Sequence, residues 1–270
     1  MADIDKVFAG SIPKLYESHL VPLIFQHYAN DIAQRLQARK LVRVLEIAAG
    51  TGVVTRAMAS TLSPAVEIVA TDLNQAMLDE GAAQGTVRPV QWRKADAMDL
   101  PFEDGAFDAV VCQFGAMFFP DRAVAYAQAR RVLKDGGLFL FNVWDRIEEN
   151  EFADEVTLAL ETVFAKDPPR FLARTPHGYS DKETITRDLV QGGFAKPVRI
   201  ETLAARSRAT SARVAAIAYC QGTPLRSEIE SRDANRLAEA TDVATVAITR
   251  RFGEGEVDGK IQAHVVMVER

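Results

Sequence analysis

The chain is poor in the features that mark secreted, membrane-spanning and metal-binding proteins. Among its 270 residues only Cys112 and Cys220 are cysteines, too few for a disulfide framework or a cysteine-based metal site. No stretch reaches the roughly 18 apolar residues of a membrane-spanning helix. Charged residues interrupt every apolar stretch of residues 1–40, which argues against a signal peptide. We therefore expect a cytoplasmic protein with no metal site and no membrane span.

An excess of positive charge is also missing. The formal net charge is −5, whereas proteins that bind nucleic acids through phosphates usually carry a clustered basic patch. The densest basic stretch, residues 206–213, is interrupted by Ser, Ala and Thr. The charge therefore predicts a small-molecule partner rather than a nucleic acid, and it gives no indication of the oligomeric state.

What the chain does have, from Leu41 onward, is short apolar runs that alternate with helical segments. This alternation predicts an α/β fold with a mostly parallel sheet and helices on both faces. Helical periodicity also predicts two helices before the first strand, and a helical insertion before the last one. The seven expected strands cover residues 41–49, 66–72, 87–94, 107–114, 137–144, 198–205 and 262–269.

The ends of the first two strands carry residues suited to a nucleotide, and open α/β sheets bind ligands at these ends. Glu46 ends the first strand, and the glycine-containing loop 48–52 follows it. Glycines let backbone amides approach a ligand closely, although an ordinary strand-to-helix turn also uses them. Asp72 ends the second strand, where it could bind both hydroxyls of a ribose or cap the helix that starts at Asn74.

The next two strand ends are individually ambiguous. Asp96 could accept a hydrogen bond from the amino group of an adenine, or it could simply form a turn. Gln113 and Phe114 could border the ligand, and core packing is the alternative for Phe114. A glycine loop, two acids at successive strand ends and the turn 134–137 before the fifth strand nevertheless occur in order. Together they predict an adenosine site.

At this point the sequence resembles the class I S-adenosylmethionine-dependent methyltransferases, in particular the small-molecule branch that includes the quinone-biosynthesis C-methyltransferases. The resemblance implies a Rossmann-like fold, S-adenosylmethionine as cofactor and S-adenosylhomocysteine as its product. The matching stretches are VLEIAAGTG (44–52), VATDLNQAML (69–78), KADAMDLPFEDGAFDAVVCQFGAMFF (94–119) and RRVLKDGGLFLFNVW (130–144), with weaker likeness over 179–194.

The resemblance also implies roles for single residues. Asp72 would hold the ribose, Leu73 and Met77 would line the adenine face, and Asp96 and Ala97 would contact the adenine edge. The glycine loop, Gln113 and Phe114 would enclose the methionine end, and Tyr16 would cover the cofactor. The implied cofactor-binding residues are Tyr16, Glu46, Ala48, Gly50, Gly52, Asp72, Leu73, Met77, Asp96, Ala97, Gln113 and Phe114.

The glycine loop departs from the family pattern at one position. Ala48 stands where the family usually has its first glycine. Alanine is acceptable there if its φ angle is negative, because only positive φ values strain a residue with a Cβ atom. We therefore expect a negative φ at Ala48.

The pattern divides the chain into three parts. Residues 1–40 are expected to form an N-terminal helical cap, and residues 41–205 and 252–270 the cofactor-binding domain. The helical insertion 206–251 could act as a substrate lid, because insertions at this place lie near the ligand-binding edge of the sheet.

The predicted chemistry is in-line methyl transfer, driven by positioning of the acceptor and exclusion of water. His177 is the best-placed general base, with a structural role as the alternative. A nicotinamide-dependent oxidoreductase is an alternative function, but Thr55 stands where the third glycine of that fingerprint belongs. A non-catalytic cofactor-binding module is a second alternative function. The acceptor itself is not indicated.

Overall fold

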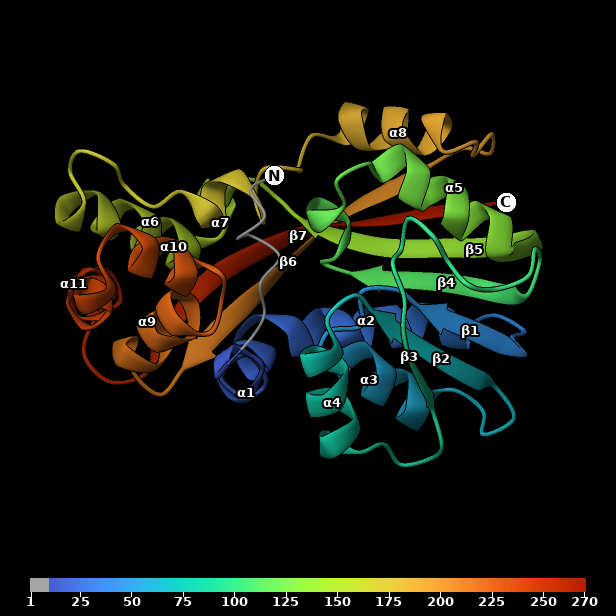
Figure 1. Ribbon diagram of the computed structural model, residues 1–270, viewed down its shortest axis with the longest axis horizontal. Coiled ribbons are helices and arrows are strands. Elements are labelled where there is room, and N and C mark those ends of the chain that lie inside the picture. Colours follow the sequence, from blue (N-terminus) through green and yellow to red (C-terminus); the bar gives the residue numbers. More distant parts are fainter. Residues whose placement is uncertain (1–9) are drawn as a thin grey trace. The chain divides into compact units, whose positions relative to one another are not determined.

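The computed structural model describes residues 10–270 (Figure 1). Its strands form one seven-stranded sheet in the order β3-β2-β1-β4-β5-β7-β6. The pairs β1–β2, β1–β4, β2–β3 and β4–β5 are parallel, which confirms the expected Rossmann-like, mostly parallel sheet. The strands are β1 Arg43–Glu46, β2 Glu67–Asp72, β3 Gln91–Lys94, β4 Phe107–Gln113, β5 Leu133–Trp144, β6 Arg199–Ala209 and β7 Val257–Glu269.

The helices lie between the strands, as the alternating pattern predicts. One of them differs in kind: η2 is a π-helix of ten residues that contains Pro22, where an ordinary helix is expected from the sequence. The helical elements are α1 Ile12–Leu15, η2 Tyr16–Phe25, α2 Gln26–Gln37, α3 Val53–Thr61, α4 Gln75–Gln84, η3 Ala116–Phe118, α5 Arg122–Val132, η4 Ile147–Glu149, α6 Glu151–Val163, α7 Phe171–Arg174, α8 Lys182–Gln191, α9 Ala212–Gln221, α10 Leu225–Arg232, η5 Ala234–Arg236 and α11 Leu237–Phe252.

The described residues form two compact units. The sheet unit comprises Gln26–Val143, Tyr179–Leu203 and His264–Arg270, and the helical unit comprises residues 10–25, Trp144–Gly178 and Ala204–Ala263. This division cuts the chain at other places than the expected domain boundaries. Residues 1–9 of the expected cap lie outside the described part of the chain. None of the helices described between residues 10 and 270 is long and apolar enough to cross a membrane.

The core of the sheet unit lies on both faces of its central strands. In β4, the residues from Ala109 to Cys112 are completely buried, because helices cover both faces of a parallel sheet. Helix α2 packs against α3, and α5 packs against α8. Figure 1 shows α5 and α8 on one side of these strands and α3 with α4 on the other.

Two helices of this unit begin with side-chain caps that fix where they start. The carboxylate of Asp121 accepts a hydrogen bond from the backbone N–H of Val124 at 3.0 Å, at the start of α5. Asp181 accepts in the same way from Thr184 at 2.8 Å, at the start of α8. The predicted N-cap at Asp181 is therefore confirmed, and each cap satisfies a backbone donor that the helix itself cannot.

Strand β5 begins earlier than expected. Residues 134–137, predicted as a turn, belong to the strand. The backbone N–H of Gly136 donates to the carbonyl of Arg270 at 3.4 Å, and the N–H of Arg270 donates to Gly137 at 3.0 Å. These residues nevertheless bulge out of the ladder with β4, since Leu133 pairs with Phe107 and Leu138 with Ala109, and Gly136 has a φ of +73°. The predicted turn is therefore an irregularity inside a strand whose pairing partner is the end of the chain.

Candidate functional site

The loop that follows β1 has an unusual run of left-handed backbone. The φ angles are +53° at Ala48, +57° at Gly50 and +80° at Gly52. The expected negative φ at Ala48 is therefore wrong. A left-handed alanine costs about 1 kcal/mol, so the surrounding structure must hold this conformation in place.

The loop after β4 leaves room for the methyl group of Ala48. A Cβ atom added to Gly115 would lie 2.5 Å from the Cβ of Ala48 and 2.8 Å from the sulfur of Cys112. The backbone of Gly115 is therefore in direct contact with the first loop, and no larger residue fits there. Alanine at 48 and glycine at 115 complement each other across the ends of β1 and β4.

Trp92, on β3, supports the glycine loop from the other side. A Cβ added to Gly52 would lie 2.4 Å from the indole Cη2, and one added to Gly81 of α4 would lie 3.0 Å from the same atom and from the backbone of Thr51. Two glycines thus make space for one indole ring against the loop. Sequence reasoning missed Trp92, although a lone tryptophan in a short, mostly exposed strand was an available signal.

Asp72 joins the end of β2 to the glycine loop. One carboxylate oxygen accepts a hydrogen bond from the backbone N–H of Gly50 at 2.8 Å, and the other accepts from the N–H of Asn74 at 2.7 Å. Burial raises the pKa of this carboxyl, while the hydrogen bonds from Asn74 and Gly50 oppose the shift. Asn74 occupies the N-cap position of helix α4, without a capping hydrogen bond from its side chain, so Asp72 is not the N-cap.

Glu46 lies at the other end of the same loop and is almost completely buried. Its Oε2 accepts a hydrogen bond from the hydroxyl of Thr55, on α3, at 2.5 Å. Burial raises the pKa of Glu46 to about 8, with a smaller contribution in the same direction from Asp72. The carboxyl is therefore mainly protonated at neutral pH when no ligand is present.

The residues expected around the adenine gather after β2 and β3. Leu73 leaves 47% of its surface exposed, and Met77 is buried beneath the first turn of α4. An exposed leucine beside two buried strand ends is suited to contact with an apolar ligand face. Asp96 accepts a hydrogen bond from the N–H of Met98 at 2.9 Å, and Ala97 is buried. Asp96 therefore forms the turn that was its alternative reading, and its contact with adenine stays a prediction.

The end of β4 contains a second strained residue. Phe114 has a φ of +50°, and its ring packs edge-on against Tyr28 with the centroids 5.2 Å apart. Its N–H donates to the carboxamide oxygen of Asn142 at 3.0 Å. Gln113, half-buried beside it, is in register with Asn142 of β5. Asn142 was missed by sequence reasoning, although an asparagine inside the apolar run LFLFNVW marked it.

The two remaining candidates, Tyr16 and His177, belong to the helical unit. Tyr16 stacks on Phe25 with the ring centroids 4.9 Å apart. His177 is buried, and its Nδ1 lies 2.8 Å from the carbonyl oxygen of Asp145. Burial lowers the pKa of His177 to about 4, so the ring is neutral at pH 7. The roles of Tyr16 as a cofactor cover and of His177 as a base stay predictions.

The residues at the ends of β1 and β2 fit S-adenosylmethionine. The hydroxyl of Thr51, in the glycine loop, is buried with no hydrogen-bond partner among residues 10–270. Glu46 is a buried acid, and the described ion pairs supply no cation to it. A ligand with polar groups and a positive charge would satisfy both groups, and the methionine end of the cofactor has these properties.

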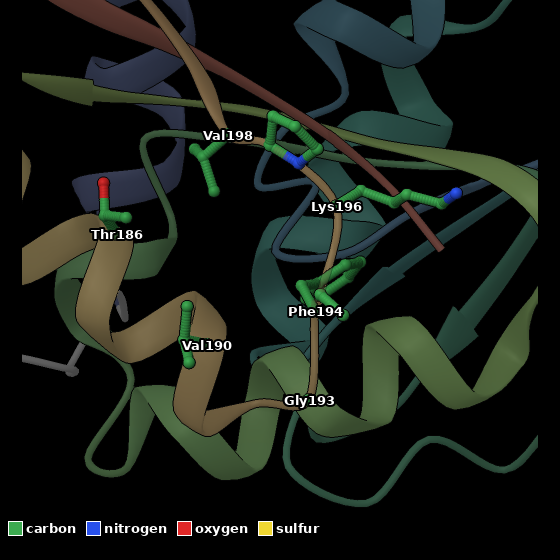
Figure 2. Close-up of a pocket in the computed structure, with 8 residues that line it drawn as sticks. Thr186, Val190, Gly193, Phe194, Lys196 and Val198 are labelled. Carbon is green, nitrogen blue, oxygen red and sulfur yellow. The ribbon is translucent and has the colours of Figure 1, made fainter.

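A separate groove lies between the end of α8 and the start of β6 (Figure 2). Its volume is about 480 Å³, and its lining is mainly apolar, with Lys196 at one side. None of the expected cofactor-binding residues contributes to this lining. The lining residues are Thr186, Val190, Gly193, Phe194, Ala195, Lys196, Pro197 and Val198.

Comparison with known proteins agrees with this reading of the strand ends. Residues 45–141 match a family described as a methyltransferase domain. The ubiquinone/menaquinone biosynthesis C-methyltransferase UbiE of Burkholderia mallei (strain SAVP1) is 36% identical over 164 residues, which cover 56% of this chain and 67% of that protein. The same figures hold for the protein of that name from Burkholderia thailandensis.

Solved structures share the fold at lower identity. The YcgJ protein of Bacillus subtilis is 18% identical with a TM-score of 0.57, and the match covers 90% of this chain and 99% of that one. An N-methyltransferase of Haemonchus contortus, solved with phosphomonomethylethanolamine and S-adenosylhomocysteine, is 18% identical with a TM-score of 0.59, over 98% of this chain and 59% of that one. Thr55 is a helical residue bonded to Glu46, and the nicotinamide alternative is not favoured. The chain belongs to the class I S-adenosylmethionine-dependent methyltransferases.

Proposed function

We propose that the chain transfers a methyl group from S-adenosylmethionine to a carbon atom of a small organic molecule. The observation that carries this proposal is the identity of 36% with C-methyltransferases over 56% of the chain. The match to the methyltransferase domain family, residues 45–141, includes the glycine loop and the ends of β1, β2 and β4. The acceptor class that suits this chemistry is an electron-rich aromatic or enolisable carbon, because such a carbon attacks a methyl group without a strong base.

The cofactor supplies an electrophilic methyl group on a positively charged sulfur. We propose that the side chains of the sheet unit hold it in one orientation. Asp72 accepts hydrogen bonds from the ribose, and Leu73 covers the adenine. The hydroxyl of Thr51, in the glycine loop, is available as a donor or acceptor for the methionine end. Fixing the methyl group for in-line attack is the main contribution that such a site makes to the rate.

The proposed location is the cytoplasm, and the proposed partner is a small molecule rather than a nucleic acid. Two observations support these proposals. Cys112 and Cys220 are both free and buried, as expected in a reducing compartment. The net charge of −5 opposes binding to phosphate backbones.

The test is a transfer assay with S-adenosylmethionine labelled in its methyl group. The acceptor panel should contain electron-rich phenols and quinols, enolisable ketones, amines and thiols. We expect the label in a new carbon–carbon bond with a member of the first two classes, and Asp72→Asn should reduce the rate. Label found only on nitrogen or sulfur would contradict the proposed acceptor class. Tight cofactor binding without transfer to any class would favour the non-catalytic module.

A further inference from the structure

Glu46 is a buried acid that forms no ion pair with any residue between 10 and 270. It is 1% exposed at the C-terminal end of β1, where the glycine loop begins. Within residues 10–270 its one hydrogen bond comes from the hydroxyl of Thr55, and no Lys, Arg or His nitrogen lies within ion-pair distance of it. Burial without a cation strongly disfavours the charged form of a carboxyl group.

The charged and titratable groups around Glu46 come from three elements. Arg56, on the same helix as Thr55, favours ionisation of Glu46 by its charge, but its guanidinium donates to the carbonyl of Thr51 at 2.6 Å. Asp72 of β2 disfavours ionisation of Glu46. Cys112 of β4 also faces it, and burial raises the pKa of that thiol to about 12. The surroundings therefore leave Glu46 neutral until a positive charge arrives.

The methyl donor and its product differ in the charge that they would bring to this loop. S-adenosylmethionine carries a sulfonium, an ammonium and a carboxylate, for a net charge of +1. S-adenosylhomocysteine has lost the sulfonium charge and is neutral overall. An ionised carboxylate within about 8–10 Å of the sulfonium, at an effective dielectric constant of about 20, would favour the donor by on the order of tenfold or more in affinity.

We propose that Glu46 gives up its proton to solvent when S-adenosylmethionine binds and regains one after methyl transfer, so that its ionisation shifts the relative affinity of the site toward the donor. This inference rests on the assignment of the glycine loop to the methionine end of the cofactor. During transfer the bond from sulfur to the methyl carbon breaks, the new bond to the acceptor forms, and the acceptor carbon loses its proton. The sulfonium charge disappears in that step, and Glu46 then takes up a proton from solvent. Glu46 acts as a residue that sets specificity for the charge of the ligand.

The experiment compares the two ligands across pH. The dissociation constants of S-adenosylmethionine and S-adenosylhomocysteine are measured by calorimetry between pH 6 and 8.5 at constant ionic strength. The α-ammonium of the donor loses its proton at lower pH than that of the product, because the nearby sulfonium disfavours a second positive charge. Both constants are therefore corrected for the fraction of free ligand whose α-amino group is protonated. We expect the preference for the donor to rise by about tenfold over this range. A ratio that does not change with pH would contradict the inference.

A second measurement counts the protons directly. Binding heats measured at pH 7 in two buffers with different ionisation enthalpies give the number of protons released. We expect the release on binding S-adenosylmethionine to exceed that on binding S-adenosylhomocysteine by a substantial fraction of one proton. Equal release with both ligands would count against Glu46 as the group that responds to the sulfonium.

The variant Glu46→Gln keeps an acceptor for Thr55 but cannot ionise. At every pH between 6 and 8.5, the ratio of its two dissociation constants should stay near the ratio that the wild type has at pH 6. The matched control is Glu67→Gln, at the start of β2, where the side chain is 41% exposed and pairs with Arg43 at 3.1 Å. This control should show the same pH dependence of the donor preference as the wild type. If Glu46→Gln also keeps a pH-dependent preference, the assignment to Glu46 is overturned.

Failure of this inference differs from failure of the cofactor assignment. If the wild-type chain binds neither ligand at any pH, the assignment of the loop to the cofactor is itself wrong. If it binds both with a constant ratio, only the role of Glu46 is wrong. Should Glu46→Gln fail to fold, Thr55→Val tests the same group. Loss of the hydrogen bond to Glu46 should move the rise in donor preference to higher pH. If the pH at which the preference rises is the same as in the wild type, the proposal is contradicted.

Discussion

Two residues near the cofactor-binding edge adopt left-handed backbone without being glycine, Ala48 and Phe114. Each is held by a specific neighbour. The methyl group of Ala48 fits against the bare backbone of Gly115, and the N–H of Phe114 is bound by the side chain of Asn142. Strain that is stabilised in this way concentrates at functional sites. Sequence reasoning located Ala48 as a departure from the family but gave it the wrong φ, because a φ angle depends on neighbours that are distant in the chain.

The pair Ala48 and Gly115 should behave as a coupled unit. We expect Gly115→Ala to lower the free energy of unfolding by about 2–3 kcal/mol, because its Cβ would overlap both Ala48 and Cys112. In the background of Ala48→Gly the same substitution should cost at least about 1 kcal/mol less. Urea denaturation of the four proteins of the cycle measures this difference. Strictly additive effects would mean that the two residues do not contact each other in solution.

Asp72 is the acid on which cofactor affinity should depend most. Asp72→Asn removes the charge and one of the two acceptor oxygens that now bind Gly50 and Asn74. Since a hydrogen bond to a charged group contributes about 1.5–3 kcal/mol, we expect affinity for S-adenosylhomocysteine to fall by about 10- to 100-fold. Asp79→Asn, on the exposed side of α4, is the control that should leave the affinity unchanged. Calorimetric titration gives both constants, and equal affinities of the two variants would exclude this role for Asp72.

At the scale of secondary-structure elements, the glycine loop depends on β3 as much as on β1. The indole of Trp92 occupies the space beside Gly52 and Gly81. The glycine loop, β3 and α4 therefore meet at this ring. Sequence reasoning expected the third strand to contribute only through Asp96 after its end. It could not foresee the indole contact, because the faces of a four-residue strand are not distinguished by its pattern.

A substitution at Gly52 allows this contact to be measured. Gly52 has φ +80° and ψ 28°, in the left-handed helical region, and a Cβ there would meet Trp92 at 2.4 Å. We expect Gly52→Ala to lower the free energy of unfolding by about 2–4 kcal/mol, of which the left-handed backbone accounts for about 1 kcal/mol. In a Trp92→Leu background the same substitution should cost only about 1 kcal/mol. Chemical denaturation of the four proteins measures this difference, and an equal cost of Gly52→Ala in both backgrounds would rule out the overlap with Trp92.

The elements themselves were predictable to different degrees. All seven strands were expected near their observed places, because most of them are apolar runs that sit between helical patterns. Strand β3, with the sequence QWRK, is the exception. Their ends were less accurate: β7 begins at Val257 rather than 262, and β6 continues to Ala209 rather than 205. Both extensions alternate between buried and exposed side chains, and the sequence pattern there was interpreted as loop and helix start. The π-helical form of η2 was also not foreseen, because its apolar spacing fits an α-helix as well.

At the scale of the whole molecule, the division into two units follows no simple boundary in the sequence. Strands β5, β6 and β7 each pass from one unit to the other within their length. A strand that crosses between units shows no change of composition at the crossing, so the sequence could not indicate this division. The expected cap, cofactor-binding domain and helical insertion stay predictions. The placement of the loops after β1, β2 and β4 at one edge of the sheet was nevertheless predictable, because the order of strand ends along the chain determines which loops share an edge. The binding of the cofactor by their residues stays a prediction.

Acid should destabilise the protein through His177. Its pKa in the folded chain is about 4, below the ordinary value near 6.5. The unfolded chain therefore binds a proton first as the pH falls, and folding stability should decrease between pH 6.5 and 4 by up to about 1.4 kcal/mol per pH unit. His177→Gln should remove this part of the pH dependence, as measured by urea denaturation at pH 7.5, 6 and 5.

The same variant separates a structural role of His177 from a catalytic one. If the ring only binds the carbonyl of Asp145, turnover measured between pH 7 and 9 should follow the fraction of folded protein. A loss of turnover at full folding, with a changed pH profile, would instead support the general base predicted from the sequence. His27→Gln, an exposed histidine on α2, is the matched substitution for both measurements.

The position of Trp92 gives the protein an optical property that can be used without labels. The chain has two tryptophans, and Trp144 belongs to the helical unit. In a Trp144→Phe variant the emission therefore comes from the one indole that touches the glycine loop. Ligand binding at that loop should change its intensity or wavelength, so a simple fluorescence titration would follow occupancy of the methyl-donor site while acceptors are screened.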